Sequence, residues 1–165
     1  MTTMLKAEAG LHGIGIAFEP AVANNFTIDM ALSAGNGYTI EPNHFNYLFI
    51  IDQPAFSFSV TPKYYYNISR RAAKGKRTDM NSGNYIGFRA KISGTSDLGY
   101  DDVFLANVHW GIQRPLGGRW LFNTHAGIGY AMNFDGAGTP YPSIDLKFSY
   151  VIVKKEAVPW KGRRD

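Results

Sequence analysis

The stretch Trp120-Leu-Phe-Asn-Thr-His-Ala-Gly-Ile-Gly-Tyr-Ala-Met-Asn133 alternates between two kinds of side chain along its whole length. One set of alternate positions is apolar and includes Trp120, Phe122 and Tyr130. The other set carries small or polar residues such as Asn123 and His125. A period of two places successive side chains on opposite faces of a β-strand. The stretch therefore predicts one long strand with an apolar face and a mixed, mostly small face.

The same alternation recurs along most of the chain. It covers residues 26–34, 56–67, 86–93, 104–113 and 144–152. Residues 6–19 change phase near Gly13, and we interpret them as one strand with a β-bulge there. The best candidate for a further strand is residues 40–51, which brings the number to the even value typical of bacterial membrane barrels. The pattern predicts an all-β chain of eight strands.

Composition limits the classes of protein to which this chain can belong. The chain has 165 residues, of which 45% are hydrophobic, 15% aromatic and 18% charged, and it contains no cysteine. One folded domain fits this length, and the aromatic content argues against disorder. The longest uninterrupted apolar run, residues 47–51, is far too short for a membrane-spanning helix. The absence of cysteine excludes disulfides, thiolate metal sites and cysteine nucleophiles.

Strand length and the small residues of the non-apolar face favour an apolar face that points to lipid, whereas the placement of charges shows only that the sheet has two different faces. Several strands alternate over ten or more residues, which is typical of membrane barrels. Charged side chains fall opposite the apolar face, together with two histidines. We expect these residues to form a polar network inside the barrel: Asp29, Lys63, Arg89, Lys91, His109, His125, Asp145 and Lys147. Tyrosine and tryptophan on the apolar face predict an interfacial girdle of Tyr64, Tyr66, Trp110, Trp120, Tyr130 and Tyr150.

The prediction is an up-and-down antiparallel transmembrane β-barrel over residues 1–153, followed by a basic tail at 154–165. An eight-stranded interior is filled by side chains, so we expect no open pore. A soluble β-barrel that binds a small apolar ligand is the alternative, because its strands alternate in the same way. The two differ in whether the protein needs detergent to stay in solution.

Basic residues gather in two places. One group is Arg70, Arg71, Lys74, Lys76 and Arg77, and the other is Lys154, Lys155, Lys161, Arg163 and Arg164. Four predicted strands separate the groups, so both should emerge at the same end of the barrel. We expect this basic rim to face the periplasm, where it would meet anionic lipid headgroups or an acidic partner protein, or simply be solvated.

The sequence offers only weak candidates for a reactive site. His109 and His125 could pair, but no spacing supports a metal site, and a hydrogen-bonded interior role is favoured. Some outer-membrane barrels are lipid A-modifying enzymes, and Ser57, Ser59 and Ser149 share the inner face with His109. No Gly-x-Ser-x-Gly motif accompanies them. We therefore expect no catalytic, cofactor-binding or metal site, while a lipid A-modifying enzyme stays a second alternative.

Three segments resemble a known family. The stretch from Ser59-Val-Thr-Pro-Lys-Tyr-Tyr-Tyr-Asn-Ile-Ser-Arg-Arg to Asn81-Ser-Gly-Asn-Tyr-Ile-Gly is similar to small outer-membrane β-barrel proteins of Bacteroidota-type bacteria. His109-Trp-Gly-Ile-Gln-Arg-Pro-Leu-Gly-Gly-Arg-Trp resembles the same family, as does the ending Asp145-Leu-Lys-Phe-Ser-Tyr.

The resemblance implies a Gram-negative outer-membrane location and a structural, surface-contact or accessory-subunit role. No signal peptide is visible at the start, and we expect it to have been removed. The partners we expect are outer-membrane lipids, including lipopolysaccharide, and a larger outer-membrane complex, but no nucleic acid.

Overall fold

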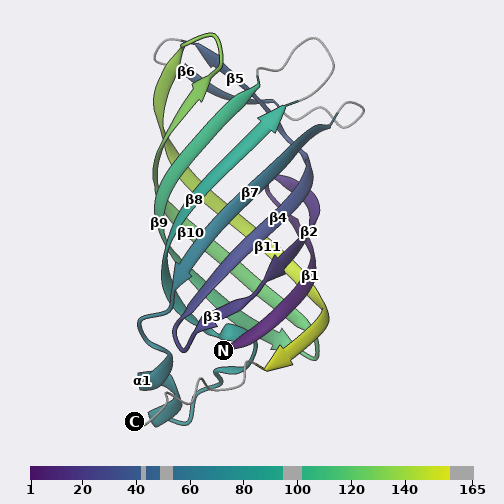
Figure 1. Cartoon of the computed structure of the whole chain (residues 1–165), viewed down its shortest axis with the longest axis vertical. Coiled ribbons are helices and arrows are strands. Elements are labelled where there is room, and N and C mark those ends of the chain that lie inside the picture. Colours follow the sequence, from purple (N-terminus) through teal and green to yellow (C-terminus); the bar gives the residue numbers. More distant parts are fainter. Residues whose placement is uncertain (42–43, 49–53, 95–101, 157–165) are drawn as a thin grey trace, which may run out of the picture.

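Eight antiparallel strands close into a barrel in a computed structural model of the chain (Figure 1), which describes residues 1–41, 44–48, 54–94 and 102–156. In chain order the elements are β1 (Thr2–Gly10), β2 (Gly13–Glu19), β3 (Ala21–Ala23), β4 (Phe26–Gly35), β5 (Gly37–Glu41), β6 (His44–Leu48), β7 (Ala55–Tyr64), α1 (Ile68–Ala73), the 3-10 helix η1 (Asp79–Asn81), β8 (Gly83–Gly94), β9 (Val103–Gly117), β10 (Trp120–Asn133) and β11 (Gly138–Glu156).

The barrel wall consists of β1, β2, β4 and β7 to β11. Each strand pairs with its neighbours in chain order, and β1 also pairs with β11, which closes the sheet. Thr2 lies opposite Glu156, so the two ends of the described chain are side by side. The short β3 adds to one edge of β4. The prediction of an eight-stranded up-and-down antiparallel barrel is confirmed.

The first part of the wall differs from the prediction. Residues 6–19 are not one bulged strand, because β1 and β2 form a hairpin that turns at Leu11 and His12, with Gly10 opposite Gly13. A two-residue turn changes the phase of the alternation just as a one-residue bulge does. Gly13 adopts a φ of 119°, which glycine reaches without steric cost. The hairpin therefore supplies two wall strands where the sequence predicted one.

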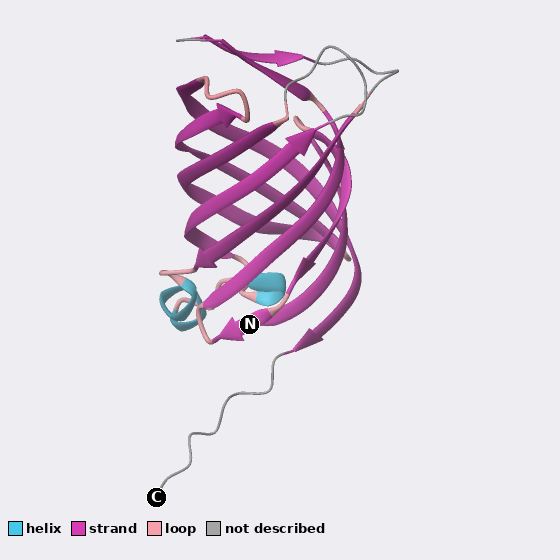
Figure 2. Cartoon of the chain, turned by 45° about the horizontal axis from the view of Figure 1, so that its top comes forward, coloured by secondary structure: helices cyan, strands magenta, loops and turns pink. Residues whose placement is uncertain are grey.

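Residues 40–51 were wrongly predicted as the eighth wall strand. Residues 42–43 and 49–51 of that range lie outside the described residues, and the remainder belongs to a separate two-stranded sheet of β5 and β6. Tyr38 and Ile40 of β5 are buried against Val103, Leu105 and Tyr141. This apolar contact holds the hairpin over the end of the barrel opposite α1 (Figures 1 and 2).

The upper part of β11, towards Gly138, has a free edge. On the side where β1 pairs, the register with β1 stops at Lys147, and within the described residues no strand pairs with β11 beyond it. The carbonyl oxygens of Ile144 and Leu146 point to this side, where they accept bonds from His12 and Leu11. Backbone groups alternate in direction along a strand, so the ring nitrogens of Pro140 and Pro142 face the same edge. Neither nitrogen carries a hydrogen.

Side chains alternate between the lumen and the outside as predicted for 26–34, 56–67 and the strands from β8 to β11. Outward positions carry exposed large apolar residues on every wall strand except β1, whose outward positions are smaller or partly covered. The prediction placed a boundary at residue 153, but β11 continues to Glu156. Residues 157–165 of the basic tail lie outside the described residues. No helix among the described residues is long and apolar enough to cross a membrane.

We expect Gly13→Ala to destabilise the barrel more than Gly136→Ala. Both glycines have a positive φ, which costs about 1–3 kcal/mol for a residue with a side chain. A Cβ at Gly13 would also meet the backbone carbonyl of Ala34, whereas a Cβ at Gly136 meets open space. This clash should add about 1–3 kcal/mol. Urea unfolding of refolded protein, followed by circular dichroism, measures both changes. Equal losses would show that β2 and β4 do not approach closely at Gly13.

Candidate functional site

Charged side chains meet across the lumen near the end of the barrel at which Thr2 and Glu156 lie. Lys6 of β1 is only 2% exposed, and its Nζ lies 2.7 Å from Oε2 of Glu19 and 2.9 Å from Oδ2 of Asp29. It also lies 3.1 Å from Oε1 of Glu8. A buried ammonium is costly unless opposite charges surround it. Three carboxylates from three strands meet this requirement.

Two more lysines complete the cluster. Nζ of Lys63, on β7, lies 2.5 Å from Oδ2 of Asp29 and 3.5 Å from Oε2 of Glu19. Nζ of Lys147, on β11, donates to Glu8 at 2.7 Å. We call Lys6, Glu8, Glu19, Asp29, Lys63 and Lys147 the ion cluster. Its three cations and three carboxylates balance in charge, and its bonds connect β1, β2, β4, β7 and β11.

The sequence prediction missed half of the ion cluster. Asp29, Lys63 and Lys147 were expected inside, but Lys6, Glu8 and Glu19 were not. The predicted network contained only charges from strands with unbroken alternation, so the charges of residues 6–19 were left out. Two separate strands place Lys6 and Glu8 on one inward set of β1 and Glu19 on the inward set of β2. The available signal was the alternation with Ala7 and Phe18, which places Lys6, Glu8 and Glu19 on the inner face whether residues 6–19 contain a bulge or a hairpin.

The other predicted network residues lie higher in the lumen, on β8 to β11. Arg89 Nη1 contacts Oδ2 of Asp145 at 3.2 Å. Lys91 donates to the hydroxyl of Tyr38 at 2.7 Å, and its Nζ lies 4.9 Å from the centre of that ring. The network therefore reaches the β5–β6 hairpin.

The two inward histidines do come together. The rings of His109 and His125 stack with their centres 4.0 Å apart. His109 Nδ1 hydrogen-bonds to Oδ1 of Asn107 at 2.7 Å, while His125 Nε2 lies 3.4 Å from the hydroxyl of Ser143. Within the described residues, no group of three or more acidic or histidine side chains could hold a metal ion. Stacking and one polar contact per ring hold the pair, while His109 Nε2 and His125 Nδ1 are buried without a hydrogen-bond partner among the described residues.

The serines weighed as nucleophiles form other contacts. Ser149 Oγ donates to Glu8 at 3.2 Å, and the hydroxyl of Ser57 bonds to that of Ser33 at 2.8 Å. Neither bond involves His109, which instead bonds to Asn107. Ser59 lies beside the lumen cavity that Arg89 and Lys147 also line. Neither Ser57 nor Ser149 is therefore hydrogen-bonded to His109, as a nucleophile and its general base would be.

Both ends of the lumen are covered. At the end near α1, the amide of Asn81 in η1 accepts from the backbone nitrogen of Thr2 at 2.7 Å and donates to its carbonyl at 2.8 Å. Met80, its neighbour, packs with Met4, Leu121 and Val151 of the strands. At the opposite end the β5–β6 hairpin packs over Val103 and Leu105. The lumen is therefore closed at both ends by segments between wall strands.

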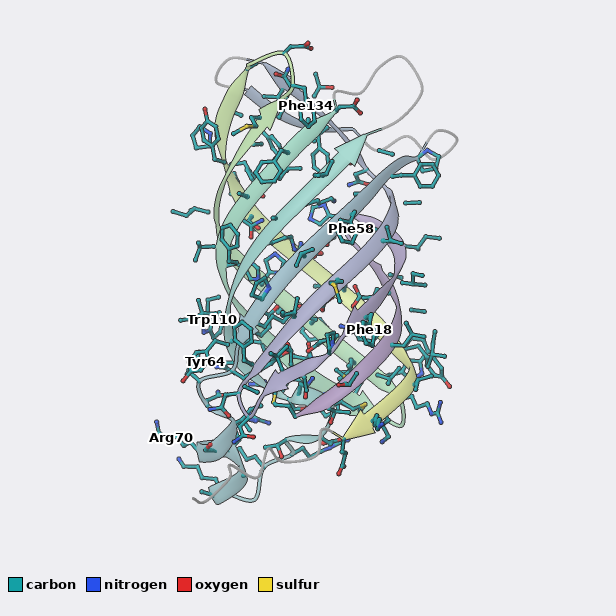
Figure 3. The ribbon with its side chains drawn as sticks, viewed as in Figure 1. Phe18, Phe58, Tyr64, Arg70, Trp110 and Phe134 are labelled. Carbon is teal, nitrogen blue, oxygen red and sulfur yellow. The ribbon has the colours of Figure 1, made fainter. Side chains whose placement is uncertain are left out.

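The predicted girdle residues are all on the outer face, and all six are exposed. Tyr64 and Trp110 lie towards the α1 end (Figure 3), and Trp110 donates to the hydroxyl of Tyr66 at 2.7 Å. Trp120 and Tyr150 pack edge to face near the same end. Tyr130 lies ten residues further along β10, towards the other end. The aromatic residues thus mark both ends of the apolar surface, but unequally.

The first basic group and the described part of the second, Lys154 and Lys155, emerge at the same end of the barrel. Arg70 and Arg71 belong to α1, and Lys74 and Lys76 follow it. Arg77 is already paired, with Nη2 2.7 Å from Oδ2 of Asp79. The hydrogen bonds from this guanidinium hold the pKa of Asp79 below its usual range. Lys154 and Lys155 are exposed near the C-terminal end of β11. Lys161, Arg163 and Arg164 are outside the described residues.

Comparisons with known proteins found no matching family model, no matching curated protein and no matching solved structure.

We expect Asp29→Asn to destabilise the barrel by about 3–5 kcal/mol, because Lys6 and Lys63 would both lose a charged partner inside the lumen. The matched control is Asp79→Asn, which removes the same charge from an exposed pair with Arg77 and should change stability little. Urea midpoints of the two variants measure the difference. A loss at Asp29 no greater than that at Asp79 would contradict a stabilising ion cluster.

Proposed function

We propose that this chain is a small outer-membrane β-barrel of Gram-negative bacteria, with a structural or accessory role and no open pore. One observation carries the proposal: the barrel is inverted, with charged groups buried inside and large apolar side chains exposed around its outer face. Water would have to solvate this apolar surface, whereas the hydrocarbon core of a bilayer would not penalise it.

The height of the apolar surface supports this location. On β10, outward residues from Trp120 to Met132 are exposed or half-buried. At about 3.3 Å per residue and a tilt of about 45°, this run climbs about 28 Å, close to the apolar band of about 25 Å in such barrels. The ring of Tyr64 lies towards one border of this band (Figure 3), and Trp120 begins the outward run of β10 at the same end, as girdle residues do.

The closed lumen favours a structural role over transport. Lys6, Lys63, Tyr65 and Tyr85 occupy the lumen and are nearly inaccessible to solvent. The lumen cavities beside Arg89 and Lys91 measure about 50 and about 20 Å³, enough for a few water molecules. Cavities of this size and polarity do not suit an apolar ligand inside the lumen. The larger apolar hollow, of about 870 Å³, lies among exposed outward side chains such as Ile16, Leu32 and Phe58, and so belongs to the outer face. A lumen site for a lipid substrate gains no support.

A pair of arginine substitutions tests membrane insertion. Val108 and Leu116 are outward residues of β9 with similar exposure, 53% and 57%, but Val108 lies mid-strand and Leu116 lies beyond the aromatic border. We expect Val108→Arg to cost about 2–4 kcal/mol for folding into lipid vesicles, and Leu116→Arg about 0–1 kcal/mol. Heat-dependent gel migration measures the folded fraction. A soluble barrel would tolerate both changes equally and would fold in buffer without lipid or detergent.

The closed lumen predicts that the wild-type protein conducts no ions. Planar bilayers containing the refolded protein should show no single-channel steps, while an open porin inserted in the same bilayers serves as the positive control. Insertion is checked separately by protease protection of the vesicle-bound protein. Regular conductance steps from the wild-type barrel would contradict the proposed absence of a pore.

A further inference from the structure

A basic pocket lies on the outer face of the barrel, between its wall and α1. It has a volume of about 390 Å³. Five cationic side chains line it: Arg70, Arg71, Lys74, Lys76 and Arg114. Four come from the segment that begins with α1, and the fifth comes from β9. The pocket therefore joins residues that are nearly forty positions apart in the chain.

None of these five cations has a carboxylate partner among the described residues. Arg114 donates from Nη1 to the carbonyl oxygen of Gln113 at 2.7 Å and from Nη2 to Oδ1 of Asn84 at 2.5 Å, so neutral groups hold its guanidinium. Arg77, six residues after Arg71, is different because Asp79 already compensates it and it does not line the pocket. The pocket thus concentrates positive charge that the protein itself leaves unbalanced.

The pocket lies at the border of the apolar band. Arg114 is four residues after Trp110 on β9, and both side chains point outward. Tyr66, which accepts the hydrogen bond from Trp110, also lines the pocket. On the side of the pocket away from α1, the outward residues are apolar. One of them is Ile86, the register partner of Trp110. A molecule with an anionic head and an apolar tail would contact both surfaces at once.

We propose that this pocket binds the phosphate-bearing headgroup of an anionic phospholipid, with an acyl chain lying on the apolar surface above Trp110. The proposal rests on the proposed membrane location. Guanidinium groups bind phosphate oxygens through paired, charge-assisted hydrogen bonds, and lysines add attraction. Anionic headgroups lie at the depth where a barrel carries its aromatic girdle. A soluble polyanion would use the charges but leave the adjoining apolar surface unused.

The test counts lipids that stay bound to the full chain. Detergent-solubilised protein is incubated with phosphatidylglycerol or phosphatidylcholine and analysed by native mass spectrometry. We expect the wild type to retain phosphatidylglycerol at least fivefold more than phosphatidylcholine. The double variant Arg71→Gln/Arg114→Gln should lose this preference. Lys154→Gln/Lys155→Gln is the matched control, since it removes two exposed charges at the same end but outside the pocket, and should keep the preference.

Folding is checked for each variant by heat-dependent gel migration. If Arg71→Gln/Arg114→Gln misfolds, Arg70→Gln/Lys74→Gln provides the test instead, because both of its residues are exposed on or beside α1. Equal loss in the pocket variant and the control would overturn the proposal, since charge alone would explain retention. Displacement of the lipid by millimolar inorganic phosphate would also overturn it, in favour of a soluble anion.

The two proposals fail in distinguishable ways. A barrel that folds into vesicles but shows no lipid preference contradicts only the headgroup site. A barrel that folds in buffer without lipid contradicts the membrane location and the headgroup site with it. Preference for lipopolysaccharide over phosphatidylglycerol in the same assay would overturn the choice of phospholipid.

Discussion

The structure depends on pairing the charged ammonium groups of Lys6 and Lys63 with carboxylates inside a lumen that water hardly reaches. Both ammonium groups contact the same oxygen of Asp29, and Glu19 adds a second carboxylate. Removing a charge from water costs several kcal/mol, so these groups are stable only where the five contributing strands stand in one register. Shifting any strand by one residue would turn its charges outward. The ion cluster thus specifies the pairing of strands as well as filling the space between them.

Closure of the lumen leaves the outer surface as the place for function. The segments between strands contribute differently at the two ends: η1 and the β5–β6 hairpin cover the lumen, while α1 faces outward with its basic residues. A barrel built in this way offers partners its rim and its wall. Both proposals made above concern that outer surface.

The alternation of side chains was sufficient to predict the wall strands from β7 to β11 and the inward position of Asp29, Arg89 and Asp145. This works because the period of a strand is a local property. The β1–β2 hairpin escaped because a tight turn and a bulge shift the phase identically. The β5–β6 hairpin escaped because Phe45 and Tyr47 alternate as in a wall strand, although they belong to β6, which pairs with β5 in a separate two-stranded sheet. The pocket at Arg114 depends on the distance between β9 and α1, which no local pattern encodes.

The two prolines on the free edge of β11 limit how two copies of this barrel can pair through their strands. An open strand edge recruits further strands through its unpaired N–H groups. Pro140 and Pro142 have no such hydrogen, so that edge cannot extend a regular ladder with a neighbouring chain. Further along the strand, the carbonyl oxygens of Ile144 and Leu146 already accept hydrogen bonds from the His12 ring and the Leu11 backbone nitrogen. Two copies of this chain would therefore not join along this edge through a regular strand ladder, and any association there would depend on side-chain contacts.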